Sequence, residues 1–135
     1  MARIRVNWDN AEIQQMLSGD GGMVDRAVAR AAGRTRDRSK ANVGRYGRVD
    51  TGTMRNSIRS QRLSGRVGVW YEVGTDVYYA MFQHDGTKAH GPRRAKAMRW
   101  TSGATIVFAK HVAGVQPAPF LKDALDRLSA SDFNL

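Results

Sequence analysis

The residues best suited to metal or proton chemistry lie in one short stretch, HDGTKAH. His84, Asp85 and His90 offer imidazole and carboxylate groups, which are common ligands of divalent metals. Their spacing matches no common ligand pattern, and a stretch of this composition is typical of a loop. The alternative is that His84 caps or packs at the end of a helix while His90 is solvated. The second interpretation is favoured, so the sequence predicts no metal site and no cofactor.

The rest of the chain offers few groups for catalysis. It has two Glu and ten Asp, and most of the Asp stand at positions typical of turns and helix caps rather than of paired catalytic carboxylates. Ser57 has no His or Lys base near it in sequence, although folding could still bring a triad together. The stretch GRYGRVDTG lacks the Lys-Ser or Lys-Thr ending of a phosphate-binding loop. With no Cys either, the sequence predicts that the protein is not an enzyme.

Positive charge is concentrated in two blocks of the 135-residue chain. Residues 26–66 hold twelve Lys or Arg and two Asp, and residues 88–110 hold six Lys or Arg and no acid, within a total net charge of +10. Such blocks favour nucleic acid or an acidic protein face as partner, while the simplest alternative is a solvated surface. The candidates for contact with DNA or with a neighbouring subunit are Arg26, Arg30, Arg34, Lys88, Arg93, Arg94 and Lys96.

Several aromatic residues stand close to the second basic block in sequence. They could stack on nucleic-acid bases beside it, as aromatic side chains do in many single-strand-binding proteins. Aromatic residues on sheets and short helices are more often buried, so we expect most of these to belong to the core. The set comprises Tyr71, Tyr78, Tyr79, Phe82 and Trp100.

The first half of the chain predicts two helices. Asp9 and Glu12 have the spacing of a capping box before a short apolar helix. A second helix follows Asp20, with apolar residues on one face and Arg residues on the other. We expect this helix to end near Val43, because two glycines follow, and Asp50-Thr51-Gly52 to form a turn that caps the next element.

The second half predicts hairpins and two further helices. Residues 57–63 and 66–74 form a hairpin joined at Ser64–Gly65, with Val67, Val69, Tyr71 and Val73 on one face. Asp76 caps a short helix that turns Tyr79 and Phe82 inward. A non-periodic, exposed loop and a second hairpin follow, and a Pro-introduced helix ends the chain. The ranges of these last three segments are 88–97, 98–109 and 116–130.

These elements predict one α+β domain. Its antiparallel β-sheet carries a long N-terminal helix, a short middle helix and a C-terminal helix packed on it. Residues 1–20 form an N-terminal arm with a short helix, residues 21–130 the core, and residues 131–135 a tail. No apolar run is long enough to span a membrane and no secretory signal is present, so we expect a protein that is not secreted.

Three motifs in order carry a family resemblance: VDTGTMRNSI, VGTDVYYAMFQHDGT and PAPFLKDAL. Together they resemble the head–tail joining, or neck, proteins of long-tailed bacteriophages, often labelled gene-10-like minor tail proteins. Met54 replaces the usual Leu, and Gln83 and His84 stand where an acidic residue is common, so a charge-pairing role there is not carried over. The matching positions are Thr51, Gly52, Ser57, Ile58, Tyr79, Gly86, Thr87, Pro119, Phe120 and Leu121.

The resemblance implies a structural virion protein without catalysis. Such proteins form a ring, here expected to hold six or twelve copies, around the DNA passage in the neck of the virion. They meet a head-closure or connector protein on one side and a tail terminator or tail tube protein on the other. DNA passing through the ring would make at most non-specific contact, and assembly would take place in the host cytoplasm. The alternatives are a tail terminator at the same joint and a basic nucleic-acid-binding protein.

Three local expectations follow from this interpretation. Phe120 and the leucines after it lie against the sheet and anchor the fold. Residues 85–96 form a loop that is mobile in the free monomer and orders on assembly, where Arg93 and Arg94 contact a neighbouring subunit, an adjacent ring or DNA. Arg26, Arg30 and Arg34 form an exposed surface of the second helix that meets the next subunit, the next ring or DNA.

Overall fold

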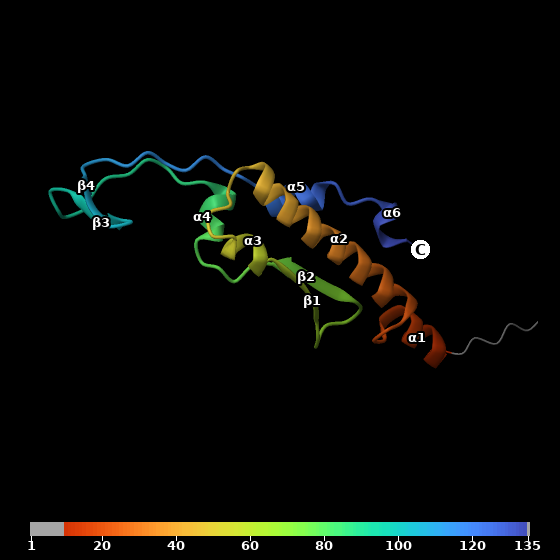
Figure 1. Ribbon diagram of the computed structural model, residues 1–135. Coiled ribbons are helices and arrows are strands. Elements are labelled where there is room, and N and C mark those ends of the chain that lie inside the picture. Colours follow the sequence, from red (N-terminus) through yellow and green to blue (C-terminus); the bar gives the residue numbers. More distant parts are fainter. Residues whose placement is uncertain (1–9, 135) are drawn as a thin grey trace, which may run out of the picture.

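The computed structural model describes residues 10–134 and confirms the α+β class (Figure 1). No helix among these residues is long and apolar enough to cross a membrane. The strands are β1 (Arg59–Leu63), β2 (Trp70–Gly74), β3 (Met98–Ser102) and β4 (Thr105–Ala109). The helices are α1 (Asn10–Ser18), α2 (Met23–Arg45), α3 (Thr53–Ser57), α4 (Ala80–Asp85), α5 (Phe120–Asp126) and α6 (Ala130–Phe133).

Helix α2 is the central element of residues 10–85 and 119–134, hereafter the body. The elements β1, β2, α5 and α6 all pack against it. Its buried face carries small residues, among them Ala27, Ala31 and Ala32, which allow close approach of neighbouring elements. The predicted end near Val43 is confirmed to within two residues. The chain leaves the helix through Gly47, whose φ of +66° is a conformation that glycine adopts without strain.

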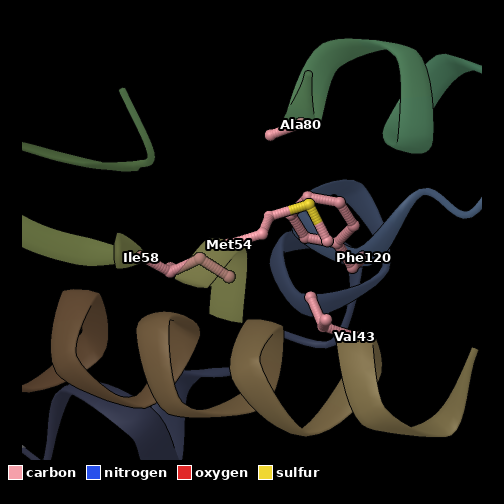
Figure 2. Packing of buried hydrophobic residues seen from close by; sticks show 5 residues of the cluster. All are labelled: Val43, Met54, Ile58, Ala80 and Phe120. Carbon is pink, nitrogen blue, oxygen red and sulfur yellow. The ribbon is translucent and has the colours of Figure 1, made fainter. Parts of the chain in front are cut away.

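The core is a small cluster of five side chains from four segments: α2, α3 with the residue after it, α4 and α5 (Figure 2). Phe120 from α5 is fully buried in this cluster, as predicted, but α5 packs mainly against α2 rather than against the sheet. The turn-and-helix motif of residues 49–58 contributes twice, because α3 and the residue after it turn two apolar side chains inward. The cluster comprises Val43, Met54, Ile58, Ala80 and Phe120.

The four strands form two separate two-stranded antiparallel sheets rather than one sheet. The β1–β2 pair runs from Arg59 opposite Gly74 to Leu63 opposite Trp70 and lies on α2. Its connection is longer than predicted and spans residues 64–69, because both Gly65 and Gly68 adopt positive φ. Val67, predicted on the inner face, is 98% exposed in this connection.

Two predictions around α3 and α4 are wrong in detail. Ser57 does not begin the sheet but is the last residue of α3. Asp76 does not cap α4, which begins after Tyr79; its carboxylate instead lies 3.4 Å from the Arg59 guanidinium. Phe82 is exposed, because Ala80 is the buried residue of this short helix and a position two residues further on points to the opposite side.

The C-terminal segment forms two short helices where one was predicted. α5 ends at Asp126, and Ser129 starts α6 with a capping box in which its side chain and that of Asp132 bond each other's backbone N–H groups. The predicted tail from residue 131 is therefore partly folded onto α2. Leu125, expected against the sheet, is 58% exposed.

Candidate functional site

Residues 86–118, hereafter the arm, leave the body as a two-stranded ribbon (Figure 1). At its base the Ala118 N–H donates to the Gln83 carbonyl at 3.0 Å, and further out His90 and Val112 exchange two backbone hydrogen bonds of 3.0 and 2.9 Å. Strands β3 and β4 form its tip, at the far end from the β1–β2 sheet. The predicted hairpin over residues 98–109 is thus confirmed, and the ribbon holds it away from the helices.

Two glycines let the sides of the arm approach closely at its base. A Cβ on Gly114 would lie 1.9 Å from the Thr87 carbonyl oxygen, which no side chain tolerates. Gly86 has a φ of +76°, and a Cβ there would lie 2.7 Å from the Val115 carbonyl oxygen. The predicted chain reversal at Gly86 is confirmed, and the sequence encodes a tightly joined ribbon.

The hairpin at the tip carries apolar side chains on both faces. Trp100 opposite Val107 lies on one face, and Ile106 and Phe108 lie on the other, since cross-strand partners share a face. Phe108 is 66% exposed, and Trp100 and Ile106 are exposed as well. β3 and β4 pair with each other alone among the described strands. The expected burial of the aromatic residues is therefore wrong for Trp100, as it is for Tyr78 and Phe82.

The arm is also the most basic projection of the described chain. It contains six Lys or Arg and no acid, and every one of them is exposed. No ion pair between described residues involves any of these six side chains. The structure thus places four predicted contact residues, Lys88, Arg93, Arg94 and Lys96, together on the arm. The mobility of residues 85–96 stays a prediction.

The predicted arginine surface of α2 is largely engaged within the chain. The Arg30 guanidinium donates to the carbonyl oxygens of Phe133 and Asn134, each at 3.1 Å. Arg34 lies 3.1 Å from the carboxylate of Asp132. Arg26 is exposed, so it is the member of the three that fits the predicted free surface. Changing all three to Glu would disturb the fold and cannot test assembly alone.

Asp132 ties the C-terminal segment to α2. It is 1% exposed, and Arg38 donates two bonds of 2.8 Å to its two carboxylate oxygens. These bonds, with the N–H of Ser129 and the side chain of Arg34, hold the pKa of Asp132 well below its ordinary value. Sequence reasoning missed this pair, although Arg34 and Arg38 stand four residues apart on one helix face.

A second buried carboxylate fixes the β1–β2 sheet to α2. Asp25 accepts bonds from the Gly21 N–H at 2.7 Å, from Arg62 at 2.8 Å and from the Tyr71 hydroxyl at 3.0 Å. The Gly21 bond is the main reason that the pKa of Asp25 is lowered, and burial raises the pKa of Tyr71. Tyr71 lies 46 positions from Asp25 in the sequence. No local pattern marks it.

Two neighbouring apolar grooves on the body, hereafter the apolar face, meet at His84 and Leu121. One of about 500 Å³ lies between α2, β2 and α5, and the other, of about 530 Å³, lies beside α4. Tyr78 is 82% exposed here, and Met81 and Leu125 are exposed too. The lining of the first includes Val28, Ala32, Tyr71, Val73, Leu125 and Phe133.

The candidate residues for metal binding and catalysis, His84, His90 and Ser57, lie in packed, exposed and hydrogen-bonded positions. The His84 ring packs edge-on against Phe120 with centroids 5.2 Å apart, and His90 is exposed in the arm, as the favoured interpretation predicted. Ser57 donates to the Met54 carbonyl at 2.7 Å and lies 2.5 Å from the Thr75 hydroxyl. Residues 10–134 contain no group of three side chains placed to hold a metal ion.

The remaining motif positions are distributed through the scaffold. Gly52 precedes α3 with a φ of +81°, and the Thr51 and Thr53 hydroxyls lie 2.8 Å apart. Thr87 bonds Val115 at the base of the arm, and Pro119 immediately precedes α5. The chain matches no protein-family model, no curated protein and no solved structure.

Proposed function

We propose that the protein is a structural component of the neck of a long-tailed bacteriophage, where copies form a ring that joins the DNA-filled head to the tail. The arm is the observation that carries this proposal. A two-stranded hairpin that packs on nothing is marginally stable in water, and this one exposes apolar side chains on both faces. Such an arm suits a chain whose finished state is an assembly.

The position of the ring follows from the three motifs that resemble neck proteins. In this proposal one side of the ring meets a head-closure or connector protein, and the other meets a tail terminator or tail tube protein. The six basic residues of the arm face either the DNA in the channel or an acidic neighbour. The protein is assembled in the host cytoplasm and remains in the virion.

The first test is the oligomeric state and shape of the purified chain. We expect sedimentation and electron microscopy to show closed rings with a central opening, of six or twelve copies. The matched control replaces residues 88–113 by Asn-Gly, which joins the arm at the point where Thr87 and Gly114 already touch. A full-length chain that stays monomeric at every concentration would contradict the proposal.

The second test is position in the particle. Antibody labelling of intact virions should mark the joint between head and tail, and loss of the gene product should leave separate heads and tails. Label at the top of a completed tail that lacks a head would instead identify a tail terminator. Label at the tail tip or on the capsid surface would exclude both.

A free nucleic-acid-binding protein is the second candidate, favoured by the acid-free, basic arm. Any chain with a net charge of +10 binds DNA at low salt and releases it as salt rises, so simple binding does not discriminate. The useful measurement is competition between DNA sequences at physiological salt. Strong preference for one sequence would favour this second candidate over the ring.

A further inference from the structure

We propose that the arm of each subunit lies on the apolar face of the next copy in the ring. The inference rests on the proposed ring and adds to it the two surfaces that meet. In this arrangement Ile106 and Phe108 at the tip cover the groove between α2, β2 and α5 of the neighbour. The occupant of the apolar face is thus a second copy of this chain.

The arm does not cover the apolar face of its own chain. It departs at Gly86 and returns at Ala118, and the bonds at its base, together with the close approach of Thr87 and Gly114, join its two sides. Its tip is consequently held away from α2 and from the β1–β2 sheet (Figure 1). The contact must therefore form between chains.

The two surfaces match in chemistry. One face of the tip presents the exposed side chains of Ile106 and Phe108, and the grooves present exposed Tyr78, Met81 and Leu125. Contact between the tip and the apolar face removes the apolar area of both surfaces from water. It also supplies the layer that the hairpin lacks in the free chain.

The charges match at the groove beside α4, whereas Lys122 lines the other groove. The arm carries six bases and no acid, whereas residues 67–87, which supply β2 and α4, carry three acids and no Lys or Arg. Asp76 and Asp85 line the groove beside α4, and their side chains are 65% and 69% exposed. The basic stretch around Arg93 and Arg94 approaches these carboxylates when the tip lies in the neighbouring groove. Electrostatic attraction then sets the orientation, and added salt weakens the contact.

The geometry of the contact leads to ring closure. An arm at one end and a receiving face elsewhere on the same chain form a heterologous interface, in which every subunit both gives and receives. Repetition closes when the rotation between copies divides a full turn. A symmetric pair of identical surfaces would stop at a dimer instead.

Cysteine cross-linking tests the contact directly, because the chain has no native Cys. Phe108→Cys and Leu125→Cys are made as separate variants, mixed and mildly oxidised. We expect disulfide-linked dimers in the mixture that vanish with reductant. A single chain carrying both substitutions should give a ladder of linked species that ends at the ring size. The matched control pairs Phe108→Cys with Val67→Cys, which is 98% exposed but lies outside both grooves, and should give little product.

A charge substitution on the receiving face gives an independent readout. Leu125→Lys should abolish rings while leaving the melting temperature close to that of the original chain, since the side chain is already 58% exposed. Leu17→Lys is the control, an exposed leucine on α1 outside both grooves. Rings that form without the Phe108–Leu125 cross-link, or that tolerate Leu125→Lys, would overturn this inference and leave the proposed function standing. Monomers alone would overturn both.

Discussion

The two hairpins of this protein have strands of equal length and opposite surroundings. β1–β2 lies on α2, and Arg62 and Tyr71 reach the buried carboxylate of Asp25 beneath it. β3–β4 stands at the end of the arm, with apolar side chains on both faces and none of the described helices packed against it. Strand length and antiparallel pairing are the same, whereas the surfaces that the two sheets pack against differ.

This contrast shows where sheet stability comes from. Two paired strands satisfy their facing backbone groups but bury little area, so a hairpin needs a second layer. The first hairpin has that layer in its own chain. The second hairpin exposes apolar side chains that a second layer would cover. We infer that another copy of the chain supplies this layer on assembly.

Replacement of one phenylalanine by alanine in each region compares what the body and the arm contribute to the stability of the free chain. Phe120→Ala should lower the free energy of unfolding by about 3–5 kcal/mol, because it leaves a cavity in the core. Phe108→Ala should change it by less than about 0.5 kcal/mol in the free chain, as expected for an exposed site. Urea denaturation of both variants measures the difference. Equal costs would show that the hairpin tip is packed in the monomer.

Loss of the Asp132 carboxylate should have the next largest effect. Asp132→Asn removes the charge that Arg34 and Arg38 bind, and should lower the melting temperature while leaving the β1–β2 sheet in place. Asp126→Asn is the control, since that exposed carboxylate contacts only Lys122 on the same helix turn.

The same carboxylate predicts a dependence on pH. The pKa of Asp132 is lower in the folded chain than its ordinary value near 4. Its contribution to stability is therefore fully present above that ordinary value and is lost as the pH falls toward the folded pKa. The gap in urea midpoint between the original chain and Asp132→Asn should narrow as the pH is lowered below 4. A difference in urea midpoint that stays constant with pH would show that the ion pair of Asp132 does not cause the difference in stability.

A smaller effect is expected from the network under the first hairpin. Tyr71→Phe removes one hydrogen bond to Asp25 and should cost about 0.5–1.5 kcal/mol. Hydrogen exchange should then rise in β1 and β2 and stay unchanged in the arm. Tyr78→Phe, at an exposed site, serves as the control. Faster hydrogen exchange in both hairpins would mean that β1–β2 and β3–β4 open together rather than independently.

The smallest effect on the body should come from the largest change to the chain. Replacement of residues 88–113 by Asn-Gly removes the hairpin and leaves the core cluster untouched, so the melting temperature should stay close to that of the intact protein. In the intact chain, β3–β4 amides should exchange rapidly in monomers and slowly in rings. A body that unfolds without the arm would show that the two regions are one cooperative unit.

The sequence by itself determined the local elements and the core anchor. Helical periodicity and two glycines marked α2, a Gly-centred turn marked the hairpin over residues 98–109, and Phe120 after Pro119 marked the buried end of the chain. These features are set by backbone preference and by the spacing of apolar residues over a few positions. A single sequence records both.

Only the tertiary structure decided which elements meet. The sequence around Asp132 does not predict its ion pair with Arg38, which lies 94 positions away. The sequence around Asp25 likewise does not predict its hydrogen bond with Tyr71. Local patterns predicted both hairpins, yet among the described residues only β1–β2 has a helix packed against it. Periodicity records which side of a strand avoids water, whereas the identity of the covering surface depends on the path of the whole chain.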